Sequence, residues 1–423
     1  MNTLREDAFS MIQESINAVM PEVAVEEALR SKIDTWKDRT GNLVVIAIGK
    51  AAWNMAATAK EILGSLITDG LIVTKYEHAK GEIDGFEIIE AGHPIPDENS
   101  VKGAMRAIEL VKDLNEDDQV VLLISGGGSA VFEKPVEGVT IQDLTIITDQ
   151  LLSCGADIVE INTIRKHLSD VKAGRFAMHC KNTPIYSVVL SDVVGDRLDS
   201  IASGPAYPDE TTSEMALDLV EKYSIFVGAH VREALTVETP KELSNVETVI
   251  TGNVKRLCES AAKSAQQLGY KPVILTTTLD CEAKEAGRFM ASIAKELKSD
   301  NAFSAYPKAP CAIIVGGETV VHVTGKGAGG RSQELVLAAA IGIENLEDVT
   351  IFAVGSDGTD GPTDAAGGIV DGESAIMMRE SGVDPDQYLR NNDAYRALNG
   401  SGDLIVTGPT GTNVNDLMVI LCR

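Results

Sequence analysis

The sequence predicts an α/β protein with a large, doubly wound N-terminal domain and a smaller C-terminal α/β domain whose sheet is mixed. Short β-branched runs alternate with helical stretches along almost the whole chain, a rhythm typical of parallel sheets with helices on both faces. The length of 423 residues exceeds what one ordinary hydrophobic core holds together, so two domains are expected. A catalytic cleft between them is then also expected.

Five apolar runs in the first half are predicted to be strands of the parallel sheet. The stretch Val121–Ile124 is hydrophobic at every position, which indicates a strand covered on both faces, although periodicity alone would also allow a buried helix turn. Residues 1–20 space their apolar side chains like an amphipathic helix and lack the pattern of a signal peptide. The predicted strands are Leu43–Ile48, Asp69–Thr74, Phe86–Glu90, Val120–Ser125 and Pro184–Leu190.

The composition shifts to Glu, Thr, Pro, Lys, Ser and Asn between Thr236 and Val246, which marks a connector. We therefore predict an N-terminal domain of residues 1–235 and a C-terminal domain of residues 246–423. A loop at Ser299–Pro310 sets off a terminal module from about residue 311. The turn Gly317–Thr319 predicts a tight hairpin, which makes this sheet mixed. Strands are predicted at Thr248–Thr251, Pro272–Thr276, Ala312–Val315, Val320–Val323, Thr350–Val354 and Leu417–Leu421.

The acidic balance of the chain limits its partners. The formal net charge of −26 opposes binding to nucleic acid and to anionic membrane surfaces. No apolar run approaches the roughly 20 residues that a membrane helix needs. The six cysteines include no C-x-x-C pair, and this usage fits a reducing cytoplasm. Small anionic substrates are the expected partners, and a homodimer is one candidate for the oligomeric state.

Two strand ends in the first half carry glycine turns suited to an anion. Gly49 and Lys50 follow a predicted strand, which places the lysine at the carboxyl edge of the sheet, where open α/β sheets bind ligands. There its ammonium could neutralise transferring phosphoryl oxygens. The alternative is a surface lysine at a helix start, which the helix macrodipole disfavours. The next turn offers successive backbone N–H groups as an anion nest, formed by Ser125, Gly126, Gly127, Gly128 and Ser129.

Charged residues further along the first half are candidates to hold substrate or metal. Arg165 and Lys166 concentrate positive charge in an acidic chain and are predicted to bind a carboxylate or phosphate, with a solvated helix face as the alternative. Asp192 follows the strand Pro184–Leu190 and is predicted to act as a base or a metal ligand. Its alternative role is to cap a turn through backbone hydrogen bonds.

Two glycine-rich turns in the second half, Gly325–Arg331 and Gly355–Gly361, are predicted to form a second anion site. Their glycines let N–H groups approach oxygens, a helix N-terminus adds positive potential, and Arg331 supplies a cationic fork. Asp357 and Asp360 nearby suit Mg²⁺ with nucleotide phosphates. The residues predicted to contact nucleotide or substrate here are Gly327, Gly329, Gly330, Gly355, Ser356 and Asn413.

The stretch Gly325–Gly330 also satisfies the G-x-G-x-x-G pattern of dinucleotide-binding turns. The context argues against that function, because the preceding run Val320–Val323 is predicted to be the return arm of a hairpin. The P-loop pattern G-x-x-x-x-G-K-[ST] does not occur in the chain.

An ordered set of motifs in both halves resembles class II glycerate kinases, the glycerate 2-kinases that carry a MOFRL-type C-terminal domain. The resemblance runs from about Lys50 to the end of the sequence. The motifs that carry it are Ala47–Ala52, Ser125–Ala130, Arg165–Ser169, Leu190–Asp196, Gly327–Glu334 and Gly355–Gly361.

The resemblance implies a Rossmann-like N-terminal domain and a cytoplasmic enzyme of carbohydrate metabolism. Its reaction would be ATP- and Mg²⁺-dependent phosphorylation of D-glycerate at the 2-hydroxyl, giving 2-phosphoglycerate and ADP. The family's catalytic lysine maps onto Lys50 and its arginine onto Arg331. We assign Asp192 as a third catalytic residue, and Asp192, Asp357 or Asp360 as the magnesium ligand.

Two other functions stay open. One is an NAD-dependent hydroxypyruvate reductase, which would use the Gly325–Gly330 turn and consume NADH. The other is a non-catalytic protein that binds sugar acids or nucleotides.

Overall fold

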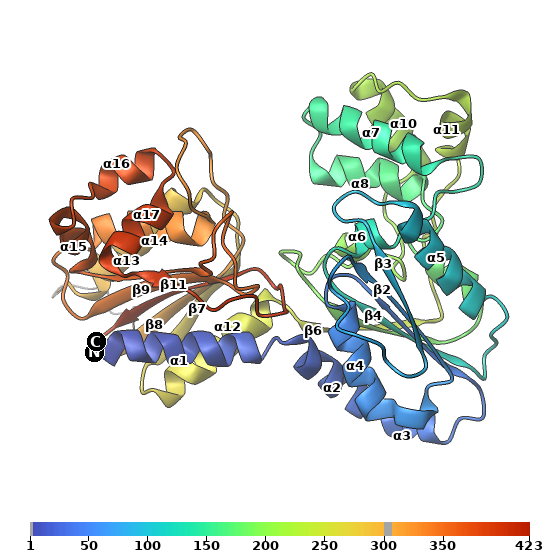
Figure 1. Cartoon of the computed structure of the whole chain (residues 1–423), viewed down its shortest axis with the longest axis horizontal. Helices are drawn as coiled ribbons and strands as arrows, with labels where there is room; N and C mark the ends of the chain where they lie inside the picture. Colours follow the sequence, from blue (N-terminus) through green and yellow to red (C-terminus); the bar gives the residue numbers. More distant parts are fainter. Residues whose placement is uncertain (1–2, 300–306) are drawn as a thin grey trace. The chain divides into compact units, whose positions relative to one another are not determined.

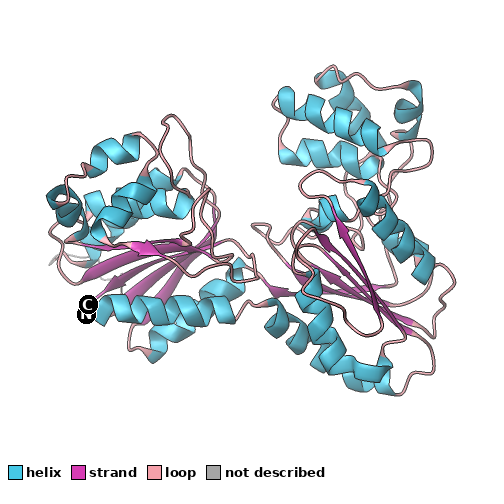
Figure 2. Cartoon of the chain, in the orientation of Figure 1, coloured by secondary structure: helices cyan, strands magenta, loops and turns pink. Residues whose placement is uncertain are grey.

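The computed structural model describes residues 3–299 and 307–423, and it divides the chain into two compact units (Figure 1). The parallel-sheet unit is Pro21–Thr251. The mixed-sheet unit combines Met1–Met20 with Gly252–Arg423. Each unit consists of one sheet with helices packed against it, which confirms the predicted α/β class (Figure 2). Among the described residues, no helix has both the length and the apolar content that a membrane crossing requires.

The sheet of the parallel-sheet unit has the strand order β3-β2-β1-β4-β5-β6, which is the Rossmann order. The first five of these strands run parallel to their neighbours. Every residue of β1, β4 and β5 is buried, because helices cover both faces, as the continuous apolar runs predicted. The strands are β1 (Leu43–Ile48), β2 (Asp69–Lys75), β3 (Phe86–Ala91), β4 (Gln119–Ile124), β5 (Ile185–Leu190) and β6 (Val246–Gly252).

Helices pack on both faces of this sheet. On one face, α5 (Glu98–Val111) packs against β2 and β3, and its apolar side joins a core with α6 (Gly128–Val131) and α9 (Arg175–His179). On the other face, α4 (Ala52–Leu63) packs against β1, β2 and β4. Alternate residues of each strand therefore pack against different helices. Two further helices, α2 (Pro21–Arg30) and α3 (Ile33–Lys37), precede β1.

Four helices of the parallel-sheet unit form a separate cluster with its own apolar core. Three of them begin at a side chain that accepts a backbone hydrogen bond, Thr140, Asp157 or Thr212, so their starts are fixed locally. The helices are α7 (Ile141–Ser153), α8 (Ile158–His167), α10 (Ser213–Lys222) and α11 (Ala229–Ala234).

The sheet of the mixed-sheet unit has the order β11-β10-β9-β12-β8-β7. Only β7 and β8 pair in parallel, and the other neighbours are antiparallel. Several of its strands follow apolar runs that the sequence analysis identified, but β10 and β11 were not predicted. The strands are β7 (Lys271–Leu279), β8 (Cys311–Gly317), β9 (Val349–Gly355), β10 (Gly367–Asp371), β11 (Leu404–Ile405) and β12 (Asp416–Cys422).

The predicted hairpin at Gly317–Thr319 is wrong. After β8 the chain runs beside residues 279–283, where Glu318 N–H donates to Leu279 O and Val320 forms an isolated parallel bridge with Glu282. Val320–Val323 is therefore no strand, and β12 takes the place of the expected return arm. The sheet is mixed, as predicted, but for a different reason.

Helices cover both faces of the mixed sheet. On one side, α1 (Thr3–Asn17) packs on α12 (Val254–Gln267) and β9. On the other, α13 (Ala283–Leu297) packs on α14 (Arg331–Gly342), and both contribute to the larger core of the unit. The remaining helices are α15 (Ser374–Glu380), α16 (Pro385–Arg390) and α17 (Ala394–Ser401).

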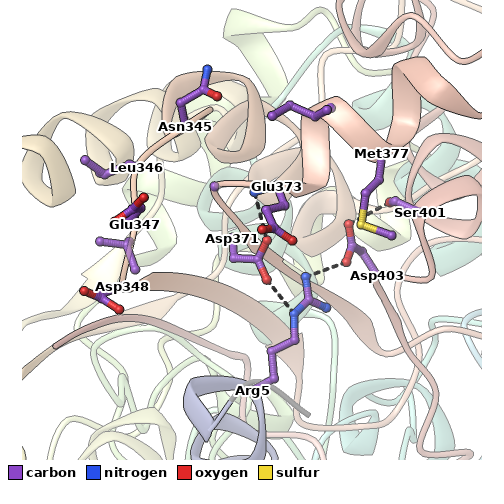
Figure 3. A pocket seen from close by; sticks show the side chains of 13 residues that line it. Arg5, Asn345, Leu346, Glu347, Asp348, Asp371, Glu373, Met377, Ser401 and Asp403 are labelled. Carbon is purple, nitrogen blue, oxygen red and sulfur yellow. Dashed lines mark hydrogen bonds and ion pairs between the residues drawn. The ribbon is translucent and has the colours of Figure 1, made fainter.

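Polar contacts attach α1 to the rest of the mixed-sheet unit. Arg5 donates to Asp371 and to Asp403 at 2.8 Å each, at the edge of a cavity of about 850 Å³ (Figure 3). Asp7 accepts from Tyr270 and Arg423 at 2.6 and 2.7 Å. These contacts explain why the first residues belong with residues 252–423.

The contact-defined units differ from the predicted domains in two places. Residues 1–20 were assigned to the N-terminal domain, but α1 packs in the mixed-sheet unit. The segment from residue 246 was assigned to the C-terminal domain, but β6 joins the first sheet beside β5. The loop predicted at Ser299–Pro310 lies largely outside the described residues.

Candidate active site

Lys50 and the Ser125–Ser129 loop follow adjacent strands of the parallel sheet. Lys50 is the second residue after β1, and Gly126 is the second after β4. The strand order reverses between these two strands, which is the place where open α/β sheets bind ligands. Gly49 has a φ of 109°, and a Cβ there would lie 2.4 Å from Ser125 O. Only glycine allows this approach, so Gly49 lets the two turns lie side by side at the carboxyl edge of the sheet.

Hydrogen bonds join the two turns directly. Lys50 N–H donates to Gly126 O at 2.9 Å, and Ala51 N–H donates to Ser125 Oγ at 3.0 Å. The Ser125 hydroxyl in turn donates to Ile48 O at 3.2 Å. Ser125 was predicted to contact substrate or nucleotide, but its buried hydroxyl is used to hold the two strand ends together.

Three polar side chains, those of Lys50, His93 and Asp192, converge on the glycines of this loop. A Cβ on Gly127 would lie 3.1 Å from Lys50 Cγ and 3.1 Å from His93 Cδ2. A Cβ on Gly126 would lie 2.1 Å from Asp192 Oδ2. His93 and Asp192 each stand two residues after a strand, β3 and β5, just as Lys50 does after β1. Because these strands are parallel, their carboxyl ends share one edge of the sheet.

His93 is a site residue that the sequence analysis missed. Burial, together with the nearby charges of Lys50, Lys75 and His78, lowers its pKa to about 4. The imidazole is therefore neutral at pH 7. Its position after a predicted strand was the available signal, the same one that identified Lys50. The two lysines, Lys50 and Lys75, place positive charge beside His93 in a strongly acidic chain.

The far side of the loop is held by a turn with unusual backbone angles. Ala202, Ser203 and Gly204 have φ values of 50°, 58° and 66°. Ser129 Oγ lies 2.7 Å from Ser203 Oγ, so the predicted contact role of Ser129 is taken by a hydrogen bond within the protein. A Cβ on Gly128 would lie 2.7 Å from Ala202 Cβ. Glycine is thus required where the loop and the turn meet.

Arg165 lies against the same loop, a placement that the sequence analysis did not predict. Its Nη2 donates to Ser129 O at 3.3 Å, and its side chain stays partly exposed. A half-exposed guanidinium beside the loop remains available to an anionic ligand.

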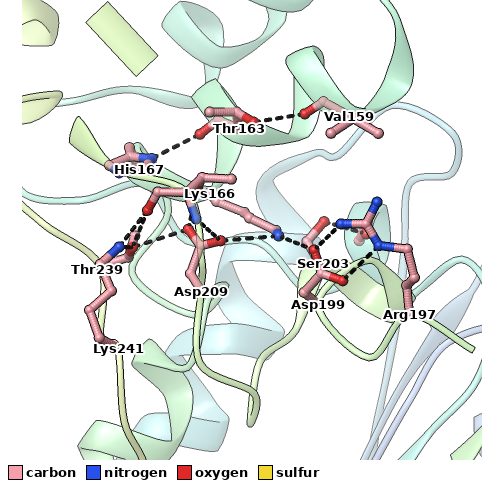
Figure 4. A network of polar contacts seen from close by, with 12 residues as sticks. Val159, Thr163, Lys166, His167, Arg197, Asp199, Ser203, Asp209, Thr239 and Lys241 are labelled. Carbon is pink, nitrogen blue, oxygen red and sulfur yellow. Dashed lines mark hydrogen bonds and ion pairs between the residues drawn. The ribbon is translucent and has the colours of Figure 1, made fainter. Parts of the chain in front are cut away.

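Lys166 does not have the role predicted for it. Its Nζ lies 3.1 Å from Asp199 Oδ2 and 3.3 Å from Asp209 Oδ1, and its side chain is 3% exposed (Figure 4). Burial would raise the pKa values of both aspartates, but the lysine and other hydrogen-bond donors lower them overall. Lys166 is a structural cation between α8 and the loops that precede α10.

Arg331 is the first residue of α14 in the mixed-sheet unit. Its Nε and Nη2 donate to Asp416 at 2.5 and 2.9 Å, and its Nη1 donates to Glu318 at 2.6 Å. Burial alone would lower the pKa of Arg331, but the two carboxylates raise it. Burial raises the pKa of Asp416 to about 7. The sequence analysis identified Arg331 but not these two partners, which flank the strands β8 and β12.

Asp360 caps a helix instead of holding a metal. Its Oδ1 accepts from Ser332 N–H at 3.2 Å and its Oδ2 from Gln333 N–H at 2.8 Å, in the first turn of α14. The carboxyl is buried, which raises its pKa to about 6. These contacts do not support the predicted metal role of Asp360, because both oxygens serve the helix N-terminus.

The other acids predicted to bind Mg²⁺ do not complete a metal site either. Asp357 accepts from Thr359 N–H at 3.0 Å in a local turn. Across residues 3–299 and 307–423, no group of three or more His, Cys, Asp or Glu residues is placed to hold a metal ion. The donor set thus does not fit a resident metal made of protein ligands alone.

The glycines of the Gly325–Gly330 turn serve contacts within the protein. Gly325 N–H donates to Asn392 Oδ1, Gly327 N–H to Asn391 O, and Ala328 N–H to Asp393 Oδ1, at 2.8 to 2.9 Å. A Cβ on Gly327 would lie 2.5 Å from Asp393 Cα. This contact does not support the prediction that Gly327 binds nucleotide, because a protein carbonyl accepts its N–H group.

The two glycine turns of this unit pack against each other and leave little room for a ligand between them. A Cβ on Gly330 would lie 2.2 Å from Asp360 Cγ, and one on Gly361 would lie 2.4 Å from Gly329 O. Gly329 itself packs beside Ala394. The predicted roles of Gly329 and Gly330 in binding are thus replaced by close backbone packing.

Ser356 and its neighbours tie the second turn to the segment before β12. Ser356 Oγ accepts from Val414 N–H at 2.8 Å, and its carbonyl accepts from Thr410 Oγ1 at 2.6 Å. The hydroxyl predicted to bind nucleotide is therefore used internally. Gly355 ends β9 beside Asp416, and Asn413 is partly buried next to Val414.

The structure argues against dinucleotide binding by the Gly325–Gly330 turn. A fingerprint turn connects a strand to a helix whose N-terminus receives the pyrophosphate. Here no strand precedes Gly325 directly, and the carboxylate of Asp360 already occupies the first turn of α14.

Comparisons with known proteins agree with this fold. Residues 7–236 match a family described as Domain of unknown function (DUF4147), and residues 311–416 match the MOFRL family. The chain is 54% identical to the D-glycerate 2-kinase of Thermotoga maritima over 99% of this chain and 98% of that protein. It is 44% identical to a glycerate 2-kinase of Pyrococcus horikoshii over 99% and 97%. A crystal structure titled glycerate kinase from T. maritima superposes with a TM-score of 0.95 at 53% identity and covers 100% of both chains. The chain therefore belongs to the glycerate 2-kinase family that carries a MOFRL domain.

Proposed function

We propose that this protein transfers the γ-phosphoryl group of ATP to the 2-hydroxyl of D-glycerate and releases 2-phosphoglycerate and ADP. The observation that carries the proposal is the position of Lys50, at the point where the strand order reverses and against the Gly126–Gly127 turn. The high identity to a D-glycerate 2-kinase over the full chain supports it.

The cationic side chains of the parallel-sheet unit suit a small dianionic reaction centre. Phosphoryl transfer depends mainly on positioning and on neutralising charge. The Lys50 ammonium neutralises the transferring oxygens, and the Arg165 guanidinium beside Ser129 holds the glycerate carboxylate. Asp192, against Gly126, accepts the proton of the attacking hydroxyl. A neutral His93 adds a hydrogen-bonding group without adding repulsion to the nearby lysines.

Arg331 is the proposed cation of the mixed-sheet unit. Its hydrogen bonds to Asp416 and Glu318 engage three of the five guanidinium N–H groups. The planar group is thereby held in one orientation, and its remaining N–H groups suit phosphate oxygens. Two carboxylates also limit how much net positive charge the group presents before a nucleotide binds.

Magnesium enters this proposal with the nucleotide, as MgATP. Mg²⁺ commonly keeps several waters and binds through one or two carboxylates together with substrate phosphates. Asp192 and Asp357 are the two acids that remain as such ligands. A cytoplasmic location, expected from the cysteine usage, belongs to the same proposal.

The test is to incubate the purified protein with D-glycerate, ATP and Mg²⁺ and to follow the products by ³¹P NMR. A resonance of 2-phosphoglycerate, together with ADP, is expected. The Lys50→Ala variant is the control and should give no product above background. Formation of 3-phosphoglycerate would contradict the proposed regiochemistry, and consumption of NADH with hydroxypyruvate in place of any phosphorylated product would contradict the kinase function.

A further inference from the structure

Two cysteines lie opposite each other on β8 and β12, two adjacent strands of the mixed sheet. Cys311 begins β8 and Cys422 ends β12, and the two residues are direct partners in the antiparallel register. Residues opposite each other in such a pair have Cβ atoms about 4.5–5.5 Å apart, close to the ~3.5–4.5 Å of a disulfide. Their side chains point to the same face of the sheet, into the core with residues of α13 and α14. Both are fully buried thiols.

The two thiols interact with each other. A hydrogen bond to the Cys422 sulfur, assisted by burial, raises the pKa of Cys311. The same hydrogen bond lowers the pKa of Cys422, and the positive charge of Lys298 acts in the same direction while burial and Asp348 oppose it. The positive charge of Lys271 opposes the rise in the pKa of Cys311. Cys422 is therefore the member of the pair that more readily becomes a thiolate, which is the reactive form.

We propose that Cys311 and Cys422 are an oxidisable pair that a hydroperoxide converts into a cross-strand disulfide and a dithiol reductant restores. The Cys422 thiolate attacks the peroxide oxygen, forms a sulfenic acid and releases the remainder of the peroxide as an alcohol or water after protonation. The Cys311 sulfur then attacks the sulfenic sulfur, the S–S bond forms, and hydroxide leaves and takes up the Cys311 proton to become water. For hydrogen peroxide, two thiols and one peroxide give one disulfide and two waters.

The position of the pair at strand ends gives the oxidant a route to buried sulfur. Cys311 is the first residue of β8 and Cys422 the last of β12, and strand ends open locally at lower cost than strand centres. The reaction should accordingly be slow compared with that of an exposed thiol. The other buried thiols differ, because burial raises the pKa values of Cys180 and Cys258 to about 12.

The disulfide would fix the register of the two strands that hold Arg331. The opposite end of the same strand pair aligns Asp416 with Gly317, next to Glu318. A slip of β12 along β8 would separate Asp416 from Glu318 and break the three hydrogen bonds of Arg331. A covalent bond at Cys311 and Cys422 opposes such a slip without touching the site.

The experiment uses a full-length variant in which the two exposed thiols are removed, Cys154→Ser with Cys281→Ser, so that four cysteines remain of six. The folded protein is treated with hydrogen peroxide, freed of oxidant, unfolded and alkylated, and its peptides are mapped by mass. We expect two thiols to be lost, and one peptide pair joining residues 311 and 422 to appear with two hydrogens fewer. Dithiothreitol should restore both thiols.

A thermal measurement on the same samples tests the consequence. The crosslink should raise the melting temperature of the mixed-sheet unit by ~5–10 °C. Cys422→Ser in the same background should abolish the rise, while Cys258→Ser, a buried cysteine of the same unit, should leave it unchanged. Four alkylatable thiols after oxidation, or sulfinic and sulfonic acids on single cysteines, would overturn the proposal. A crosslink without any rise in melting temperature would overturn the inference about register.

Discussion

Two glycine clusters of this chain, Gly126–Gly128 and Gly325–Gly330, resemble each other in sequence but have different contacts in the structure. In the parallel-sheet unit, Gly126 and Gly127 lie against the side chains of Lys50, His93 and Asp192. In the mixed-sheet unit, the turn Gly325–Gly330 lies against the backbone of residues 391–393 and donates its N–H groups to them. A glycine cluster therefore indicates that something approaches the backbone closely. Whether that is a functional side chain or another part of the chain depends on contacts far away in sequence.

The largest effect is expected for Lys50→Ala, which tests the function of the first cluster. Loss of the ammonium beside the first cluster should lower kcat about 10³-fold, because it removes charge stabilisation from the transferring phosphoryl group. The melting temperature should stay unchanged, since the Lys50 ammonium is not part of the core. Steady-state kinetics with D-glycerate and ATP check this. Lys75→Ala, which removes another charge near His93, is the matched control and should lower kcat less than 10-fold.

A second test separates two neighbouring cations near the first cluster. Lys166→Ala should lower the free energy of unfolding by about 3–5 kcal/mol, because it leaves the buried Asp209 without its cation; Asp199 is partly exposed and keeps its ion pair with Arg197. Arg165→Ala should instead raise KM for D-glycerate and cost less than about 1 kcal/mol of stability. Urea unfolding and kinetics on the two variants measure both effects. Equal losses of stability would contradict the assignment of Lys166 as structural and Arg165 as substrate-facing.

The third test exchanges one glycine of each cluster for alanine. In Gly327→Ala the new methyl meets the backbone of Asp393 at 2.5 to 2.6 Å, so the turn must separate from it and the unfolding free energy should fall by about 2–3 kcal/mol. In Gly126→Ala the methyl meets the end of the Asp192 side chain, which can rotate away. That variant should lose activity and keep its stability to within about 1 kcal/mol. If both variants lose mainly activity, the Gly325–Gly330 cluster binds a ligand, which would contradict its assignment as a packing contact.

The smallest effect is expected for Asp360→Asn. At pH 7 the loss of a charged cap of α14 should cost about 1 kcal/mol. The pKa of Asp360 is about 6 in the folded protein and 3.8 in the unfolded chain, so the folded state takes up the proton first as the pH falls. Acidification from pH 6 to pH 4 should therefore raise the unfolding free energy of the wild type relative to that of the variant, by no more than about 1.4 kcal/mol per pH unit. Urea unfolding at several pH values measures the difference in unfolding free energy between wild type and variant. If acidification lowers the stability of the wild type relative to the variant, the pKa of Asp360 in the folded protein lies below 3.8.

The fold could be predicted wherever one strand carries its own signal. The run Leu43–Ile48 is apolar at every position and became β1 with those bounds. The run Val320–Val323 is also rich in valine, yet Val320 and Val323 are more than half exposed because the chain lies beside another segment instead of in the sheet. Local composition does not specify which segment will provide the hydrogen-bond partner.

The candidate site could be predicted in part for the same reason. Lys50 was identifiable because a strand, a glycine and a helix follow one another in sequence. The structural roles of Lys166 and Asp360 could not be predicted, because they depend on Asp209 and on Ser332, which are brought to them only by folding. His93 followed a predicted strand and could have been found by the rule that identified Lys50.

The attachment of α1 to the mixed-sheet unit has a consequence for synthesis of the protein. The partners of Arg5 and Asp7 include Asp371, Asp403 and Arg423, which leave the ribosome 366 to 416 residues later. At about 5–20 residues per second, α1 waits roughly 20–70 s for them. During that time the parallel-sheet unit, whose chain is complete at residue 251, can fold. In sequence it separates the two segments of the mixed-sheet unit. The apolar face of α1 is the surface that a nascent-chain chaperone would have to cover in the interval.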